Sequence, residues 1–181
     1  MDYAYLLDHA RQGLQQDKSV RHFKQALITT GLKLTTHKHG QKRLQNLLHL
    51  YQVSGLQALV RYSGLSRLLG MHQLEKILPR IPFHRSLKLS KRPQQTRGKL
   101  GLFTGCTGNL FDQQTLQDTV SLLERLGYEV LVPEQQNCCG ALHQHQGQLA
   151  EALRLARQNI AAFAEVDTII YIASGCGAQL K

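Results

Sequence analysis

The sequence is poor in aromatic residues and has no segment apolar enough to cross a membrane. It contains no tryptophan, and aromatic residues make up only 6% of its 181 positions. A packed core must therefore rest on Leu, Ile, Val and Ala, and the hydrophobic content of 42% is sufficient for one. No run of about 18 apolar residues occurs, and the first residues lack the features of a signal peptide. These absences predict a cytoplasmic protein.

Acidic residues are scarce in the first half of the chain. Residues 1–97 contain 17 Lys or Arg but only four acids, whereas residues 98–181 contain five bases and eight acids. The net charge of +10 therefore comes entirely from the first half. A basic surface of this kind suits anionic lipid, nucleic acid or an acidic protein, and the charge alone does not choose among them.

Helical periodicity dominates residues 1–82, which we interpret as a helical linker region. Apolar residues recur at helical spacing over residues 3–30 and again over 41–78. Glycines are expected to divide the second stretch into short helices and prolines to end it: Gly55, Gly64, Gly70, Pro79 and Pro82. Residues 83–98 are polar and basic and are predicted to form a linker.

The pattern changes at residue 99. Short apolar runs at 99–104, 128–132 and 168–173 predict strands, and the stretches 112–126 and 146–165 predict helices. The order β-α-β-α-β predicts an α/β fold with a parallel sheet, a Rossmann-like half of a doubly wound domain. Because three strands would leave an open edge, we expect the domain that begins at residue 99 to be incomplete at residue 181.

The four cysteines of the chain follow the three predicted strands. Cys106 comes after the first strand, Cys138 and Cys139 after the second, and Cys176 after the third. Loops that follow parallel strands emerge at the same carboxyl edge of the sheet, where α/β folds bind ligands. Cysteines more than thirty residues apart in the sequence are therefore expected to lie in neighbouring loops. The sequence predicts one site formed by four thiols.

Several kinds of chemistry suit such a site. A disulfide between Cys138 and Cys139 is disfavoured, because adjacent Cα atoms lie about 3.8 Å apart, closer than the roughly 4.4 Å at which ordinary disulfides begin. Four cysteines suit an iron–sulfur cluster or structural zinc, although the short cysteine knuckles usual for zinc are missing. Buried structural thiols are the third interpretation. We favour a bound cofactor, since all four cysteines occupy equivalent positions along the fold.

The cysteine spacing resembles that of a known family. Cys106, the Cys138-Cys139-Gly140 sequence and Cys176 resemble the CCG cysteine-rich domain of heterodisulfide reductases and of iron–sulfur subunits that oxidise glycolate, lactate or glycerol 3-phosphate. The local sequences around them are most similar to the glycolate oxidase iron–sulfur subunit. The fullest family pattern ends in a fifth cysteine where this chain has Gln179. The chain also lacks ferredoxin-type cysteines and a second CCG repeat, so it resembles an internal fragment.

The resemblance implies an electron-transfer role in an oxidoreductase. A flavoprotein subunit would oxidise glycolate or another 2-hydroxy acid with its flavin, and this subunit would pass electrons to a quinone or similar acceptor. The implied cofactor is an iron–sulfur cluster of the 4Fe–4S type on Cys106, Cys138, Cys139 and Cys176. The fragment alone is not expected to be active. The alternative is an interaction module stabilised by zinc or by thiols, without redox activity.

Other features are interpreted as secondary. His143 and His145 form a His-x-His pair, and His145 is a weak candidate ligand because it closely follows the CCG sequence. We favour solvated surface histidines here. The basic helices of residues 41–92 are interpreted as a spacer that packs on a partner subunit, with peripheral contact at the inner membrane second. Nucleic acid is not expected as a partner.

Overall fold

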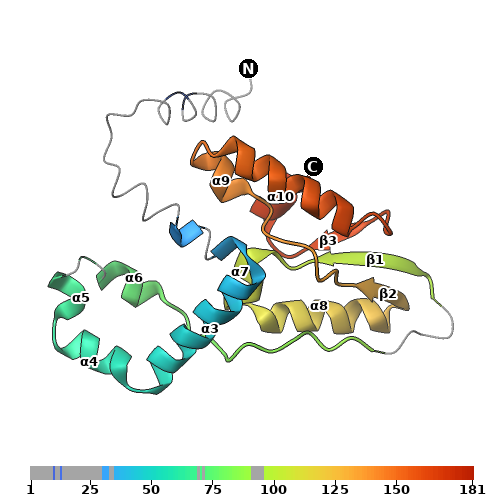
Figure 1. Cartoon of the computed structure of the whole chain (residues 1–181). Helices are drawn as coiled ribbons and strands as arrows, with labels where there is room; N and C mark the ends of the chain where they lie inside the picture. Colours follow the sequence, from blue (N-terminus) through green and yellow to red (C-terminus); the bar gives the residue numbers. More distant parts are fainter. Residues whose placement is uncertain are drawn as a thin grey trace.

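The chain folds into a helical part followed by a three-stranded parallel sheet with helices on both faces (Figure 1). The predicted α/β class is therefore confirmed. The structure is a computed structural model. It describes residues 10, 13, 30–32, 35–68, 70, 72–90 and 96–181. The helices predicted over residues 3–30 fall almost entirely outside the described residues.

The sheet is built from three short strands in the spatial order β2-β1-β3. Strand β1 (Gly98–Phe103) is central and pairs in parallel with β2 (Tyr128–Leu131) and with β3 (Ile169–Tyr171). All three predicted strands are confirmed, although β3 is shorter than the apolar run that predicted it. Because every strand is parallel, their carboxyl ends lie at one edge of the sheet.

Helices cover both faces of the sheet, and β1 supplies both cores. On one face, α8 (Gln113–Arg125) packs Leu116 and Val120 against Leu102, and all three side chains are fully buried. On the other face, α10 (Leu149–Ala162) packs Leu155 into the cluster that contains Phe103. Phe103 directly follows Leu102 in β1. Successive side chains of a strand point to opposite faces, so this alternation follows from the sequence of β1. Each fully buried side chain of this kind contributes about 1.5–3 kcal/mol.

Over residues 38–77, the described residues of the helical part form four helices that the glycines divide as predicted. They are α3 (Lys38–Val53), α4 (Leu56–Tyr62), α5 (Leu65–Leu68) and α6 (His72–Ile77). Gly55, Gly64 and Gly70 lie between them and all have positive φ angles, which glycine adopts without strain. No helix of the described residues is both long and apolar enough to cross a membrane.

Polar rather than apolar side chains are buried in α3. The buried residues of α3 are Gln41 and Gln45, while several apolar side chains of this region are exposed. The exposed ones are Leu47, Leu50, Val53, Leu56, Leu59, Tyr62 and Ile77. Among the described side chains of this part, the buried glutamines of α3 are held by hydrogen bonds, and most of the large apolar side chains of α3 and α4 are exposed.

Glu75 is the centre of a second group of hydrogen bonds in the helical part. Its carboxylate accepts from Tyr51 Oη (3.1 Å), Gln57 Nε2 (2.7 Å) and Arg61 Nε (3.1 Å), which joins α6 to α3 and α4. Burial alone raises the pKa of Glu75, but the hydrogen bonds from Gln57, Tyr51 and Arg61 outweigh it and lower the pKa below 4.5. The ionised carboxylate is thus the form that the fold stabilises.

The Glu75→Gln variant is expected to lose about 1–2 kcal/mol of unfolding free energy at pH 7, because a neutral amide accepts these bonds less strongly. The lowered pKa means that this stabilisation is present above pH 4.5 and disappears as the pH falls through the pKa of the folded state. Urea unfolding of both proteins at pH 7 and at acidic pH measures the difference. Asp167→Asn, at an exposed position, is the control. A difference that stays constant on acidification would contradict the interpretation.

The extended segment, residues 78–90, lies against α8 and includes the described first half of the predicted linker, residues 83–98. Side chains of α8 bind its backbone: Gln113 accepts from the N–H of Arg85, Gln117 from that of Lys88, and Glu124 from that of Ser90. The segment is ordered because the polar face of α8 supplies the partners that a neighbouring strand would otherwise provide.

Candidate functional site

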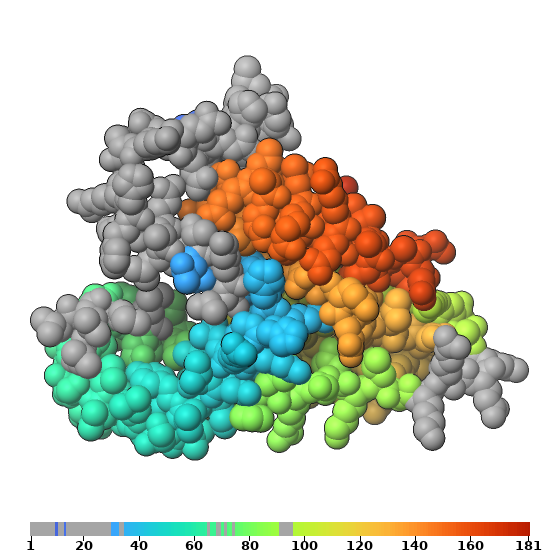
Figure 2. Space-filling model, viewed as in Figure 1, coloured from blue at the N-terminus to red at the C-terminus, as the bar shows by residue number. Residues whose placement is uncertain are grey.

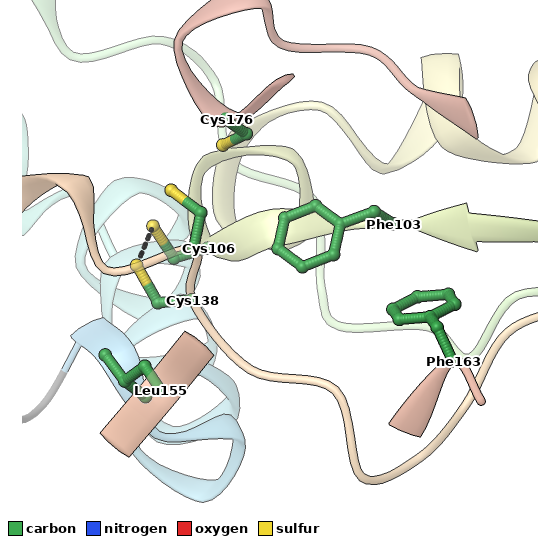
Figure 3. Close-up of a cluster of buried hydrophobic side chains, with 7 residues drawn as sticks. Phe103, Cys106, Cys138, Leu155, Phe163 and Cys176 are labelled. Atoms are coloured by element: carbon green, nitrogen blue, oxygen red, sulfur yellow. Dashed lines mark hydrogen bonds between the residues drawn. The ribbon is translucent and has the colours of Figure 1, made fainter. Parts of the chain in front are cut away.

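The four cysteines come together at the carboxyl edge of the sheet, as predicted. Cys106 follows β1, Cys138 and Cys139 follow β2, and Cys176 follows β3. All four are buried and none forms a disulfide. Figure 3 shows the sulfur atoms of Cys106, Cys138 and Cys176 gathered beyond the ring of Phe103. Residues separated by 70 positions in the chain thus share one small volume.

Two of the cysteines lie in helices rather than in loops, contrary to the sequence interpretation. Cys106 lies in α7 (Gly105–Phe111) and Cys176 in α11 (Ser174–Leu180), each in the first turn. Both helices have seven residues and are rich in glycine, so their sequences carry little helical signal. Cys138 and Cys139 lie in the loop after β2, as expected.

The sulfur atoms form a chain of hydrogen bonds. Cys138 Sγ donates to Cys106 Sγ at 3.5 Å, the contact drawn as a dashed line in Figure 3. Hydrogen bonds from Cys138 and from Cys176 lower the pKa of the Cys139 thiol to about 3. The bond from Cys138 also lowers the pKa of Cys106 against the effect of burial. Donating these bonds raises the pKa of both Cys138 and Cys176. Acceptors and donors therefore alternate along the chain of sulfurs.

The donor set fits a metal–sulfur cofactor. Four cysteine sulfurs converge in a buried site, and two of them are held in a setting that favours the thiolate, the form that binds metal. Within the described residues, no three His, Cys, Asp or Glu side chains are arranged to hold a single metal ion. Cys₄ ligation of iron–sulfur clusters uses thiolate donors of this type.

Gln136 and Asn159 fix the loop that carries Cys138 and Cys139. Gln136, which is 1% exposed, accepts from the N–H of Thr104 (2.9 Å) and donates to the carbonyl of Leu102 (3.1 Å). It thereby ties the loop to the end of β1, directly before Cys106. Sequence reasoning missed this residue, because a glutamine in a polar loop is ordinarily solvated.

Asn159 holds the same loop from the other side. Its side chain, on α10, accepts from the N–H of Asn137 at 2.8 Å and donates to the carbonyl of Cys138 at 3.0 Å. The residue is 2% exposed. The available signal in the sequence was a polar residue on the buried stripe of α10, whose other buried residues are Ala152 and Leu155. The side-chain amide of Asn159 thus satisfies two backbone groups at the cysteine pair, the N–H of Asn137 and the carbonyl of Cys138.

Gly140 explains the third residue of the Cys-Cys-Gly sequence. Its φ angle is +89°, and a Cβ atom at this position would lie 3.2 Å from both Cα and O of Ala152 on α10. The close approach lets the chain turn from the cysteine pair directly into α9 (Ala141–His145). Only glycine meets both the conformational and the steric requirement.

The Gly140→Ala variant is expected to lose about 2 kcal/mol or more of unfolding free energy, because positive φ is strained and α10 must shift. Chemical denaturation followed by circular dichroism measures the loss. Gly55→Ala is the matched control, since Gly55 also has positive φ (+79°) but has no atom near its Cβ position. An equal loss in both variants would show that the contact with Ala152 contributes nothing.

The histidines after the loop separate into two environments. His143 is fully buried, and its Nδ1 lies 2.6 Å from Gln148 Oε1, so the expectation of a solvated side chain is wrong there. His145 is exposed. Gln179, at the position of the family's fifth cysteine, donates to Gln144 Oε1 at 2.7 Å and joins α11 to α9. A glutamine amide thus makes a structural contact at that position.

Two family descriptions match this chain. Residues 25–78 match the linker region of the glycolate oxidase iron–sulfur subunit, and residues 100–181 match the cysteine-rich domain called CCG. Together the matches cover most of the chain.

Three relatives illustrate the range of similar proteins. The chain is 36% identical to the probable glycolate oxidase iron–sulfur subunit of Bacillus subtilis, over 98% of this chain and 42% of that protein. It is 40% identical to lactate utilization protein A of Geobacillus kaustophilus, over 46% of this chain and 35% of that protein. It is 36% identical to a subunit of the fumarate reductase (CoM/CoB) of Methanothermobacter marburgensis, over 49% of this chain and 18% of that protein. The chain spans less than half the length of these relatives. No solved structure matches it.

Proposed function

This chain belongs to the glycolate oxidase iron–sulfur subunit family, and we propose on that basis that it carries electrons through an iron–sulfur cluster. The observation that supports the proposal best is the convergence of four buried thiols from three strand ends. The proposed ligands are Cys106, Cys138, Cys139 and Cys176. A 4Fe–4S cluster accepts four thiolates, and when bound it supplies reversible one-electron chemistry.

The residues around the thiols have distinct roles in this proposal. Gln136 and Asn159 orient the loop of the cysteine pair through its backbone. Phe103 and Leu155, each almost completely buried, belong to the same cluster as the cysteines and keep water away from the sulfur atoms. Backbone held by such contacts needs little rearrangement when the charge of the site changes. Exclusion of water also tunes the reduction potential.

The proposed role within a complete enzyme follows from the relatives. A flavoprotein partner would oxidise glycolate or another 2-hydroxy acid, and this chain would pass the electrons toward a quinone or similar acceptor. The proposed location is the cytoplasm, with contact to the inner face of the membrane. The names of the glycolate oxidase subunit and of the lactate utilization proteins support a role in the oxidation of a 2-hydroxy acid.

Anaerobic reconstitution of the whole chain with iron and sulfide tests the cluster. We expect a brown protein with about four iron and four sulfide per chain. Zinc bound without sulfide would favour the alternative, an interaction module without redox activity. A colourless chain that binds neither iron nor sulfide after reconstitution would overturn the proposal.

A further inference from the structure

A pocket of about 420 Å³ lies between α3 and the α/β part, separate from the cysteine site. Its walls come from α3, from residues 84–89 of the extended segment, from α7 and α8 and from the loop after β2. None of the four cysteines lines it. In Figure 2 the cyan surface of α3 lies directly against the yellow-green surface of the extended segment. The volume is within the range that small organic ligands occupy.

The charge of the lining is predominantly positive. Lys38, Lys42 and Arg85 face a single carboxylate, that of Glu134. Lys38 Nζ donates to the carbonyl of Pro133 at 3.2 Å, so part of its hydrogen-bonding capacity is used. Within the described part of the chain, the charged ends of Lys42 and Arg85 make no hydrogen bond or ion pair. Two cationic groups are thus left available in a concave site.

The neutral part of the lining is fixed by its own hydrogen bonds. Asn109 Nδ2 donates to Thr104 Oγ1 at 2.9 Å and to Gln41 Oε1 at 3.4 Å. His84 Nδ1 lies 2.9 Å from Gln45 Oε1 and 3.0 Å from Gln113 Nε2. Thr104, Gln41 and Gln45 are almost completely buried. The polar walls are therefore held in place before any ligand enters, which reduces the entropy lost on binding.

Burial and nearby charges shift the pKa of two groups in the lining, Lys38 and His84. Burial lowers the pKa of Lys38, and the charge of Lys42 lowers it further, against the opposing effect of Glu134. Burial and then Lys42 also lower the pKa of His84. Lys42 therefore disfavours positive charge at both groups, whereas Glu134 favours it at Lys38.

We propose that this pocket binds a small organic anion through carboxylate or phosphate oxygens, with Lys42 and Arg85 as its cationic contacts. Such oxygens are the groups that lysine and arginine bind most strongly. Leu87, Leu89 and Val132 provide the apolar wall against which the carbon skeleton of the ligand packs. Thr104 and Asn109, which belong to the segment around Cys106, place the bound anion next to the turn that carries this cysteine.

Isothermal titration calorimetry of the whole chain in chloride buffer, with the thiols reduced and no metal present, tests this site. The probes are malonate, a dicarboxylate, and inorganic phosphate. We expect saturable binding of at least one of them, and a loss of affinity of about tenfold or more in Lys42→Ala and in Arg85→Ala. A response to malonate alone identifies a carboxylate site, and a response to phosphate alone identifies a phosphate site.

Arg80→Ala and Lys76→Ala are the matched controls, because both remove one positive charge outside the pocket. Binding that survives in these controls and is lost in the pocket variants supports the site. Equal losses in all four variants would show a diffuse effect of net charge and would overturn the proposal, as would the absence of saturable binding by either probe. The readout does not depend on a cluster, so it is independent of the proposed electron transfer.

Discussion

The Cys139→Ser variant is expected to lose nearly all of the iron and acid-labile sulfide that the unaltered chain binds on reconstitution. Cys139 accepts hydrogen bonds from both Cys138 and Cys176, and its thiol has a pKa of about 3. It is therefore the sulfur most readily deprotonated in the site. Serine has nearly the same shape but does not form the soft metal–sulfur bond. The loss in affinity should exceed the roughly 10- to 100-fold typical of removing a supporting hydrogen bond.

The measurement is iron and sulfide content per chain, together with the visible absorption spectrum, after anaerobic reconstitution. Ala178→Ser is the matched control, since it introduces the same hydroxyl on an exposed position of α11, two residues from Cys176. Far-UV circular dichroism of both variants monitors the fold. Full cluster content in Cys139→Ser would exclude this residue as a ligand.

The Asn159→Leu variant is expected to destabilise the reduced, metal-free chain by about 2–5 kcal/mol. Leucine fills a similar volume, but the N–H of Asn137 and the carbonyl of Cys138 both lose their partner in a buried environment. Each unsatisfied buried group costs about 1–3 kcal/mol. Because these groups flank the cysteine pair, the variant should also bind the cluster more weakly.

Urea unfolding measures the first effect, and cluster content after reconstitution measures the second. Arg157→Leu is the control, because it places the same residue on an exposed position of α10. Should Asn159→Leu match this control in stability, the loop must be held by other contacts and the role assigned to Asn159 is wrong. Retention of the cluster despite lower stability would separate the structural role of Asn159 from cofactor binding.

The location of the thiols was predictable because it depends on strand order alone. Short apolar runs before Cys106, Cys138 and Cys176 predicted parallel strands, and parallel strands end at one edge. The role of Gln136 was not predictable, since it acts through backbone groups that only the folded chain brings near it. Asn159 stands out in the sequence as a polar residue on an apolar stripe, but its backbone partners are set by the fold. The need for glycine at position 140 was not predictable either, because it comes from the close backbone of Ala152 on α10.

The helical part shows a different limit of sequence interpretation. The glycines correctly predicted where its helices end, because a positive φ angle is a local property. The pattern of leucines did not predict what is buried, since Gln41 and Gln45 are inside while Leu47 is 64% exposed. Long-range hydrogen bonds, such as that from Gln45 to the carbonyl of Pro82, decide this burial. Polar residues buried by such bonds look like surface residues in a sequence.

The assembly of the thiol site from three strand ends determines the order in which the protein matures. Between Cys106 and Cys138 lie 31 residues, and between Cys139 and Cys176 lie 36. In an unfolded chain, a metal that joined these thiols would first have to close two long loops, at an entropic cost that short cysteine knuckles avoid. Folding of the sheet removes this cost before any ligand arrives. Cofactor loading should therefore follow folding, and a chain that cannot form β3 should bind the cluster more weakly.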